Sequence, residues 1–464
     1  NRKRKLIKES IGMRVASPCS IGVYVPSTKI HLKGKSAVER FLSVFGTVHR
    51  GEGITALLLM LNVFLLLTAY YIIKPVREAL ILGSAGAEIK SYAGAGQALL
   101  FLVIVPFYSA YASRTNRVRL INGVIAFFIS NLAVFYVLGR LQFRLGVVFF
   151  LWVGLFNLML VAQFWAFAND IYTEKQGKRL FAIVGIGSSL GAIVGARVAG
   201  WLFVPIGPYS MMLVTAALLA VCMILTTWIH HREGVANRPR SEAAWQPLGN
   251  SGGFRLVFRH RYLFLIAILV LLSNLVNTTG EFILGKTVAQ HAQSAPNAEA
   301  FIGEFYSSFF FWVNLVGAAL QMFAVSRIMK YIGIGPALFV LPVIALGSYT
   351  LLAFAPILSF IRLAKIGENS TDYSIQNTVR HALFLNTSRA AKYKAQSAIE
   401  SFFWRTGDAL SALLVFIGTK FAFDIPKFAS ANIIFVLMWL AVAVFIVQIR
   451  KRQRVAEAEL RAAA

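Results

Sequence analysis

The chain has 464 residues, of which 58% are hydrophobic and 14% are charged, and its mean hydropathy is +0.67. Soluble domains are about one quarter charged, so this composition excludes a soluble protein and indicates several membrane spans. A net charge of +27 would indicate nucleic-acid binding only in a soluble chain. The two cysteines, Cys19 and Cys222, lie far apart in the sequence and predict neither a disulfide framework nor a metal site.

Residues 1–50 contain 11 Lys and Arg residues and show no helical period before about residue 38. We interpret them as a basic cytoplasmic tail or an upstream extension. A targeting peptide is the alternative, because organellar transit segments are also basic.

Apolar runs of about 20 residues predict the membrane spans. They lie at residues 54–73, 92–112, 120–138, 147–168, 180–200, 209–229, 262–279, 305–326, 331–353, 355–374, 397–419 and 431–449. The longest polar interval, 230–261, divides them six and six, as in transporters built from two halves. The predicted fold is an all-α polytopic membrane protein of twelve helices, with six-helix bundles at 51–229 and 262–449 and a basic tail at 450–464.

Lys and Arg residues are concentrated in every second predicted loop. The loops after the even-numbered spans carry 17 of them, whereas the other five loops carry six. Because positive loops remain in the cytoplasm, this pattern predicts that both termini and the 230–261 loop are cytoplasmic. We expect a multi-pass protein of a bacterial inner membrane.

The stretch GEFILGKT at residues 280–287 matches the letters of a phosphate-binding loop. Such a loop needs a preceding strand and a glycine-rich bend. Here an apolar run, YLFLIAILVLLSNLV, precedes it and helix-compatible residues fill it. We therefore predict that a membrane helix continues through the stretch and that it binds no nucleotide in this manner.

Charges within the spans are candidate functional groups, because a charge in the bilayer costs at least about 2.5 kcal/mol. Lys74, Arg77 and Glu78 follow span one, on one helix face around Pro75. The apolar residues 79–82 favour burial of this group. The alternative is that these charges cap the outer end of the span.

A polar stripe at helical spacing runs through span ten and its extension. Its members are Arg362, Lys365, Asn369, Asp372, Gln376 and Arg380. The apolar flanks favour the lining of an aqueous cavity, and a surface helix after a short span is the alternative.

Span eleven places Arg405 three residues before Asp408, with Glu400 more than one turn earlier. An ion pair that joins two helices and a ligand contact are both compatible with this spacing.

The end of span seven places Asn274, Asn277 and Glu281 on one helix face, followed by Lys286. We expect a cavity wall with Lys286 at its outer mouth.

Span five carries Gly187, Gly191 and Gly195 at four-residue spacing, which predicts close helix packing in lipid. The scattered histidines and the absence of Glu-x-x-His and Gly-x-Ser-x-Gly patterns argue against metal or nucleophile chemistry. We therefore expect no catalytic residues, no metal, no cofactor and no enzymatic activity.

Four stretches give the chain a family resemblance over residues 51–450. They are YYIIKPVREALILGSAGAEI, FWAFANDIYTEKQGKRLFAIVGIGSSLGAIVG, SNLVNTTGEF and KYKAQSAIESFFWRTGDALSA. On these stretches the chain resembles the bacterial and plastid ATP/ADP translocases. The resemblance implies a twelve-helix fold similar to the major facilitator superfamily, and ATP/ADP exchange or nucleotide symport by alternating access.

In the resembled family, two lysines and two acids matter for transport, and they fall here on Arg77, Val153, Asn277 and Arg405. Both basic positions keep a cation, whereas both acids are lost. The resemblance therefore implies a phosphate-bearing substrate more directly than ATP/ADP exchange. Glu78 and Glu281 are nearby acids that could substitute.

The expected function is transport of nucleotides through a basic cavity at the membrane midplane, with ATP or ADP as the small-molecule partner. Arg and Lys suit phosphate oxygens as bidentate and point-charge donors. Transport of another organic or phosphorylated anion and a non-transporting membrane scaffold are the alternatives. The predicted substrate-binding residues are Lys74, Arg77, Glu78, Asn277, Glu281, Arg362, Lys365, Asp372, Arg405 and Asp408.

Overall fold

The protein is described by a computed structural model, which covers residues 37–43, 47–49, 51–112, 115–234, 253–385, 387 and 391–463. Within these residues every regular element is a helix, so the predicted all-α class is confirmed. Most of the basic segment 1–50, the larger part of the 230–261 interval and Cys19 lie outside the described residues.

The helices follow one another with short connections. The first are α1 (Ala37–Leu42), α2 (Gly53–Ser84), α3 (Gly86–Ala112), α4 (Arg117–Arg140), α5 (Gly146–Ile171) and α6 (Glu174–Glu233). The next are α7 (Gly253–Arg259), α8 (Arg261–Ala292), α9 (Ala298–Ala319), η3 (Leu320–Ala324), α10 (Val325–Arg327), η4 (Ile328–Ile332), α11 (Ile334–Ala337) and α12 (Val340–Phe354). The last are α13 (Leu358–Thr371), η5 (Asp372–Gln376), α14 (Asn377–Ala382), η6 (Ala391–Ala395), α15 (Gln396–Ala398), η7 (Ile399–Phe403), α16 (Trp404–Lys420) and α17 (Ile425–Ala463).

Nine helical segments within the described part of the chain are long and apolar enough to cross a membrane. One of them contains most of α6, which bends at Gly207 between Pro205 and Pro208. α13 and α16, of 14 and 17 residues, are too short to be counted, and π-helical turns adjoin both. A polytopic membrane protein is confirmed, whereas the number of twelve spans stays a prediction.

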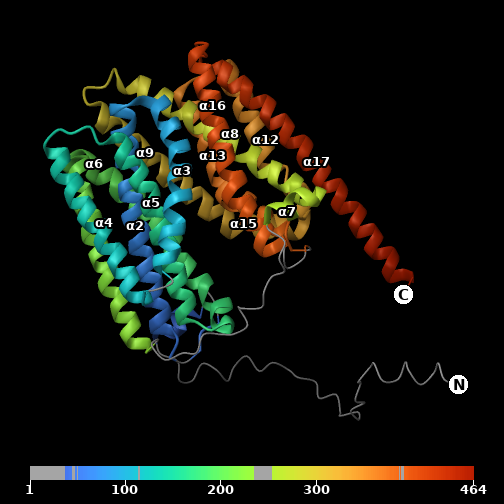
Figure 1. Ribbon diagram of the computed structural model, residues 1–464, viewed down its shortest axis with the longest axis horizontal. Helices are drawn as coiled ribbons and strands as arrows, with labels where there is room; N and C mark the ends of the chain where they lie inside the picture. The colour runs from blue at the N-terminus through green and yellow to red at the C-terminus, as the bar shows by residue number, and fades with distance from the viewer. Residues whose placement is uncertain are drawn as a thin grey trace, which may run out of the picture.

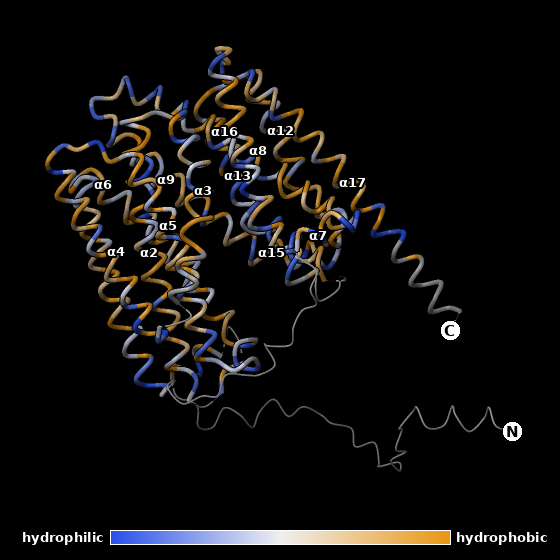
Figure 2. Tube along the Cα trace, viewed as in Figure 1, coloured by the Kyte–Doolittle hydropathy of each residue, from blue (hydrophilic) through white to orange (hydrophobic). Residues whose placement is uncertain are grey.

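The helices form two groups that meet along α3 and α9 (Figure 1). α2, α4, α5 and α6 lie together, and so do α8, α12, α13, α16 and α17. α3 packs on α8 and α16, while α9 packs on α2 and α6, so each group contributes a helix to the other. Hydrophobic residues dominate the helices in Figure 2, and hydrophilic ones mark helix ends and the course of α13.

Glycines allow α6 to pack closely against α2. A Cβ atom at Gly187, Gly191 or Gly195 would lie 2.3–2.6 Å from the carbonyl oxygens of Met60, Phe64 and Thr68, respectively. The glycines and the carbonyls both recur every four residues, so one ridge of α2 fits one groove of α6. The predicted small-residue packing face is confirmed.

The stretch 280–287 lies inside α8, which is helical from Arg261 to Ala292. Its backbone N–H groups are therefore used within the helix and do not converge on a phosphate. The prediction of a continuing helix is confirmed.

Candidate functional site

α2 carries its charged group deep in the bundle. The helix passes through Pro75 without interruption and ends at Ser84, and both Lys74 and Glu78 are buried. Glu78 forms an ion pair with Arg77 and a second one with Lys90 of α3, whose Nζ lies 2.6 Å from Glu78 Oε2. These side chains are therefore not exposed caps at the end of a span.

Lys74 occupies an aromatic environment between the two helix groups. Its Nζ lies 4.0 Å from the ring centre of Phe310 in α9 and 5.1 and 5.8 Å from those of Tyr71 and Tyr70. The residue is 8% exposed, and no carboxylate of the described residues forms an ion pair with it. Ring faces stabilise a cation but do not neutralise it.

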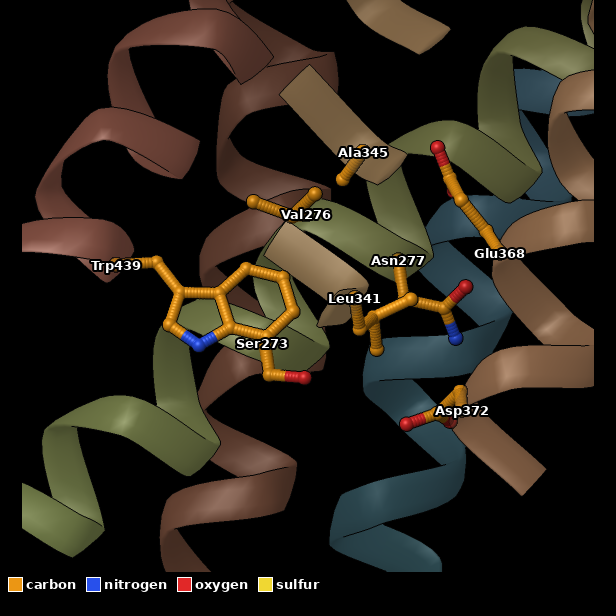
Figure 3. Close-up of a pocket in the computed structure, with 8 residues that line it drawn as sticks. All are labelled: Ser273, Val276, Asn277, Leu341, Ala345, Glu368, Asp372 and Trp439. Atoms are coloured by element: carbon orange, nitrogen blue, oxygen red, sulfur yellow. The ribbon is translucent and has the colours of Figure 1, made fainter. Parts of the chain in front are cut away.

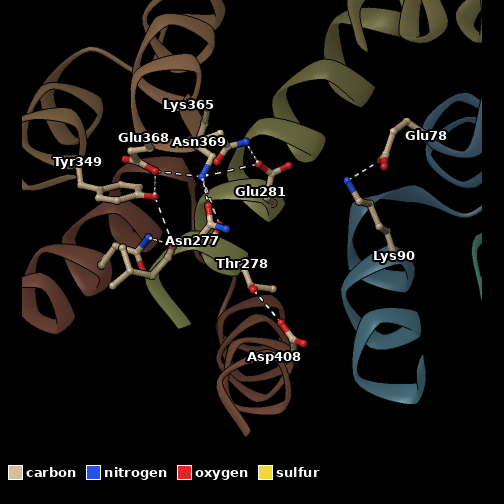
Figure 4. A network of polar contacts seen from close by, with 12 residues as sticks. Glu78, Lys90, Asn277, Thr278, Glu281, Tyr349, Lys365, Glu368, Asn369 and Asp408 are labelled. Carbon is tan, nitrogen blue, oxygen red and sulfur yellow. Dashed lines mark hydrogen bonds and ion pairs between the residues drawn. The ribbon is translucent and has the colours of Figure 1, made fainter. Parts of the chain in front are cut away.

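A second lysine, Lys365 of α13, lies in a network with α8 and α12 (Figure 4). Its Nζ donates to Asn277 Oδ1 at 2.8 Å and to Glu368 Oε2 at 3.0 Å, and lies 3.7 Å from Glu281 Oε1. The Tyr349 hydroxyl also donates to Glu368 Oε2, at 3.0 Å. This cation therefore has two carboxylates close to it.

The polar stripe of α13 and η5 faces the interior. Lys365, Asn369, Asp372 and Gln376 are all buried, so the alternative of a surface helix is wrong. Asn369 Nδ2 donates to Glu281 Oε1 at 2.8 Å.

The first member of the stripe, Arg362, lies towards α9. It donates to Ser308 Oγ of α9 at 2.8 Å and lies over the ring of Phe305. No carboxylate in the described part of the chain forms an ion pair with it.

A small cavity adjoins this stripe (Figure 3). Its polar lining comes from Ser273 and Asn277 of α8, Glu368 of α13 and Asp372 of η5. The remaining lining residues are apolar or aromatic: Val276, Leu341, Ala345 and Trp439. The stripe thus borders a small cavity of mixed polar and apolar lining, and the lining of an aqueous cavity stays a prediction.

Arg405 and Asp408 of α16 join two helices. Asp408 accepts from Arg405 Nη1 at 3.1 Å, and also from Asn274 at 2.7 Å and Thr278 at 3.0 Å in α8. Arg405 is 39% exposed on its side chain and lies 4.9 Å from the ring centre of Phe101 in α3. The pair therefore fixes α16 on α8 and leaves the guanidinium accessible.

Nine of the ten predicted residues lie in three groups. The first is Lys74, Arg77 and Glu78, near Lys90; the second is Asn277, Glu281, Lys365 and Asp372, along α8, α13 and η5; and the third is Arg405 with Asp408. The first two groups adjoin, because Glu281 also interacts with Lys74 and Arg77, whereas Arg362 lies apart, towards α9. Lys90 of α3 contacts Glu78, the partner of Arg77, and Phe101 of α3 lies beside Arg405. Between Lys90 and Phe101 the helix rises about 16 Å, at 1.5 Å per residue. Arg77 and Arg405 therefore lie at different depths.

Sequence reasoning missed three members of these networks. Lys90 lies between the predicted spans 54–73 and 92–112 and is therefore expected in a loop, whereas the structure places it in α3 and in contact with the buried Glu78. Glu368 and Tyr349 were not singled out. The three-residue spacing of Glu368 from Lys365 was a usable signal, whereas nothing in the sequence places Tyr349 of α12 beside them.

Lys286 pairs with Glu88 of α3 at 3.0 Å and lies over the rings of Phe282 and Phe428. This ion pair connects the two helix groups near the end of the bundle where α2 stops at Ser84. Lys286 thus belongs to a helix–helix contact.

Comparison with known families assigns this fold. The family model described as the Major Facilitator Superfamily matches residues 54–378. The chain belongs to the Major Facilitator Superfamily. The all-helical fold is therefore that of a superfamily member, as the sequence resemblance implied.

Among curated proteins, this superfamily member is similar to ADP,ATP carrier protein 1 of Chlamydia pneumoniae, with 22% identity over 62% of the chain and 64% of the relative. It is also similar to ADP,ATP carrier protein 1 of Rickettsia typhi, with 21% identity over 61% of the chain and 64% of the relative. The resemblance stated from sequence is confirmed. The chain spans less than two thirds of the length of these relatives.

Solved structures of the same fold include the nucleoside transporter NupG, with a TM-score of 0.61, 14% identity, and coverage of 86% of this chain and 99% of that one. A peptide transporter POT in complex with sulfate has a TM-score of 0.60, 13% identity, and coverage of 89% and 99%. At these identities the likeness concerns the fold.

The two positions at which the resembled family carries acids have different surroundings here. Val153 is fully buried in the apolar core of the first helix group. Asn277 contacts Lys365, and Glu281, one turn further along α8, also lies close to this lysine. Asn277 thus shares its lysine partner with a nearby acid, whereas Val153 is surrounded by apolar side chains.

Proposed function

We propose that this protein carries a phosphate-bearing anion, specifically a nucleotide, across a membrane by alternating access. One observation carries the proposal: Lys74 is a buried cation between the two helix groups and forms no ion pair with a carboxylate of the described residues. Membership in the Major Facilitator Superfamily and similarity to proteins named ADP,ATP carriers support it.

The electrostatics of Lys74 favour an anionic ligand. Taking a lone ammonium out of water costs several kcal/mol, which ring faces offset only by about 2 kcal/mol. An anion that enters the site removes this penalty, and a phosphate chain offers several oxygens to it. The rings of Tyr70, Tyr71 and Phe310 around Lys74 provide flat surfaces on which a nucleobase can stack.

The location of Lys74 suggests how binding is coupled to movement. Tyr70 and Tyr71 belong to α2 in one group, while Phe310 belongs to α9 in the other. A ligand at Lys74 therefore touches both groups and stabilises whichever arrangement brings them together around it. We propose that the Glu88–Lys286 pair breaks and reforms as one end of the protein opens and closes.

Arg77 and Arg405 extend this site in our proposal. Because they lie at different depths along α3, they act on one substrate only if the substrate is elongated along the membrane normal. Nucleoside di- and triphosphates have such a shape, with a base at one end and charge at the other.

The test is uptake of labelled ATP and ADP into proteoliposomes, with and without internal nucleotide. We expect uptake that Lys74→Met lowers at least tenfold, whereas Lys420→Met, a matched change at an exposed position, leaves it unchanged. If a sugar phosphate or a carboxylate inhibits this uptake more strongly than unlabelled ATP does, the transported substrate is another anion. Equal uptake by both variants would contradict the role of Lys74.

The membrane arrangement is also part of the proposal. We propose two six-helix halves, 51–229 and 262–449, with the segment 230–261 and both termini in the cytoplasm of a bacterial cell. Accessibility tags at position 245 and at the C-terminus should be cytoplasmic, and a tag at position 296 should be external. An external tag at position 245 would contradict this orientation.

No hydrolysis is expected. A continuous α8 leaves 280–287 without free backbone donors. Purified protein should show no ATPase activity, and a steady activity lost in Lys286→Ala would contradict the carrier function.

A further inference from the structure

A cation lies on the lipid-facing side of α6. Arg197 is exposed and belongs to a stripe of exposed apolar side chains, Leu190, Val194, Trp201 and Val204. The intervals along the stripe are four, three, four and three residues, so one face of the helix carries all five. An exposed apolar face of a membrane-spanning helix contacts lipid tails. Arg197 is therefore unusual, because charges within the membrane normally face the bundle interior.

Arg197 has only aromatic partners in the described part of the chain. Its guanidinium carbon lies 5.2 Å from the ring centre of Trp201 and 5.5 Å from that of Phe311 in α9, the helix that packs beside α6. No carboxylate of the described residues pairs with it, and its N–H donors have no acceptor among them. Glu304, an exposed acid of α9, lies seven residues from Phe311, which is about 10 Å along the helix.

Ring contacts offset only part of the cost of this charge. A ring stabilises a cation at an exposed site by about 0.5–1 kcal/mol, whereas a charge at the centre of a membrane helix costs at least about 2.5 kcal/mol. The remaining cost favours an anion from outside the chain as the partner of Arg197.

The depth of Arg197 favours a lipid phosphate as this anion. The first crossing of α6 runs from Arg179 to the bend at Gly207, a length of about 42 Å. For a crossing centred in the membrane, the Cα atom of Arg197 lies about 9 Å inside the edge of a hydrocarbon core about 30 Å thick. A long arginine side chain reaches towards that edge, and Trp201, one turn nearer to it, lies where Trp residues are enriched. The apolar stripe around Arg197 excludes soluble anions.

We propose that Arg197, Trp201 and Phe311 form a binding site for a phospholipid with a net negative headgroup. In the proposed membrane orientation this lipid belongs to the outer leaflet. The guanidinium donates two parallel hydrogen bonds to phosphate oxygens, while the acyl chains lie on the apolar stripe. A zwitterionic lipid carries a cation beside its phosphate, which weakens its attraction to Arg197. The site goes beyond the proposed carrier function, and its test needs no transport.

Quenching of tryptophan fluorescence tests the site. Full-length protein is reconstituted in mixed vesicles of phosphatidylcholine and phosphatidylglycerol, with bromine on the acyl chains of one lipid or the other. The signal of Trp201 is the difference between each protein and the same protein carrying Trp201→Phe. Phosphatidylglycerol should be preferred about fivefold at Trp201 in the wild type, as for one cation near an anionic lipid, and should lose this preference in Arg197→Gln.

Two further variants control for charge and side of the membrane. Arg140→Gln removes an exposed cation at the end of α4, on the same predicted side of the membrane, and should keep the preference at Trp201. Arg197→Lys should keep part of it, because lysine retains the charge without the bidentate geometry. In detergent, added phosphatidylglycerol should raise the thermal midpoint of the wild type and of Arg140→Gln more than that of Arg197→Gln.

Four results overturn the lipid site. The first is equal quenching of Trp201 by the two lipids in the wild type, and the second is a preference that persists in Arg197→Gln. The third is a preference that disappears when phosphate replaces chloride at equal ionic strength, because the anion would then be a soluble one. The fourth is a wild-type dimer that Arg197→Gln converts to a monomer, which would make Glu304 of a second copy the partner of Arg197.

Discussion

Two buried lysines, one in each helix group, have opposite surroundings. Lys74 of α2 lies among the rings of Tyr70, Tyr71 and Phe310 and forms no ion pair with a carboxylate of the described residues. Lys365 of α13 has two carboxylates and an amide oxygen within 3.7 Å of its Nζ. The same residue type, buried in both places, therefore has two different electrostatic environments.

From this comparison we propose that the cation with carboxylate partners serves folding and that the other serves a ligand. A compensated cation stabilises the structure because its removal leaves carboxylates unpaired. An uncompensated cation costs stability as long as the site is empty, so its retention has to be explained by what it binds.

The largest expected effect is at Lys365. Lys365→Met leaves Glu368 and Glu281 without their cation and should destabilise the protein by about 3–5 kcal/mol. Thermal unfolding in detergent measures this against Lys420→Met. The double variant Lys365→Met/Glu368→Gln should recover part of the loss, and a double variant as unstable as the sum of the single ones would contradict the coupling.

Lys74 should behave in the opposite way. Lys74→Met removes a cation that forms no ion pair with a carboxylate of the described residues, so the thermal midpoint should stay equal or rise. Nucleotide uptake should nevertheless fall at least tenfold, a change of about 1.4 kcal/mol. A variant that loses thermal stability as strongly as Lys365→Met would remove the distinction between the two lysines.

Arg77 and Arg405 test whether cations at different depths act on one substrate. Arg77→Gln and Arg405→Gln should each lower uptake about tenfold, as for one lost charge-assisted contact. Lysine at either position should retain more activity than glutamine, because it keeps the charge. Uptake is normalised to folded protein in the membrane.

The control for these variants is Arg140→Gln, at an exposed position at the end of α4. If both arginine variants transport as well as this control, the arginines serve only as structural partners of Glu78 and Asp408.

The smallest effect is expected at an ion pair outside the membrane spans. Glu52 accepts hydrogen bonds from Arg179, from the His49 backbone N–H and from Gln176. Burial alone would raise the pKa of Glu52, but these contacts, with Arg179 first, lower it. Because the pKa is lowered in the folded state, the stabilisation is complete above the pKa of the unfolded chain and is lost as the pH falls through the folded value.

Arg179→Gln should therefore cost at most about 1 kcal/mol at neutral pH, as for other pairs at the protein surface. The difference in thermal midpoint between this variant and the wild type should shrink in acid. If the difference in thermal midpoint is the same at neutral and acidic pH, Glu52 is not the group through which Arg179 stabilises the protein.

The sequence by itself determined the all-helical membrane class, because composition and runs of apolar residues follow directly from the cost of placing polar groups in lipid. It also placed the glycine face of α6, the continuation of the helix through 280–287 and the burial of the charged group after span one. Each of these is a local property, since the helical period fixes which residues share a face.

Only the tertiary structure decided how those faces are paired. Spacing put Lys365 on a polar stripe, but Glu281 and Asn277 come from α8 and Tyr349 from α12. Lys90 was expected in a loop, and the antiparallel packing of α3 on α2 brings it to Glu78. Whether a buried charge is compensated depends on contacts between segments far apart in the chain, and helical spacing within one segment carries no information about them.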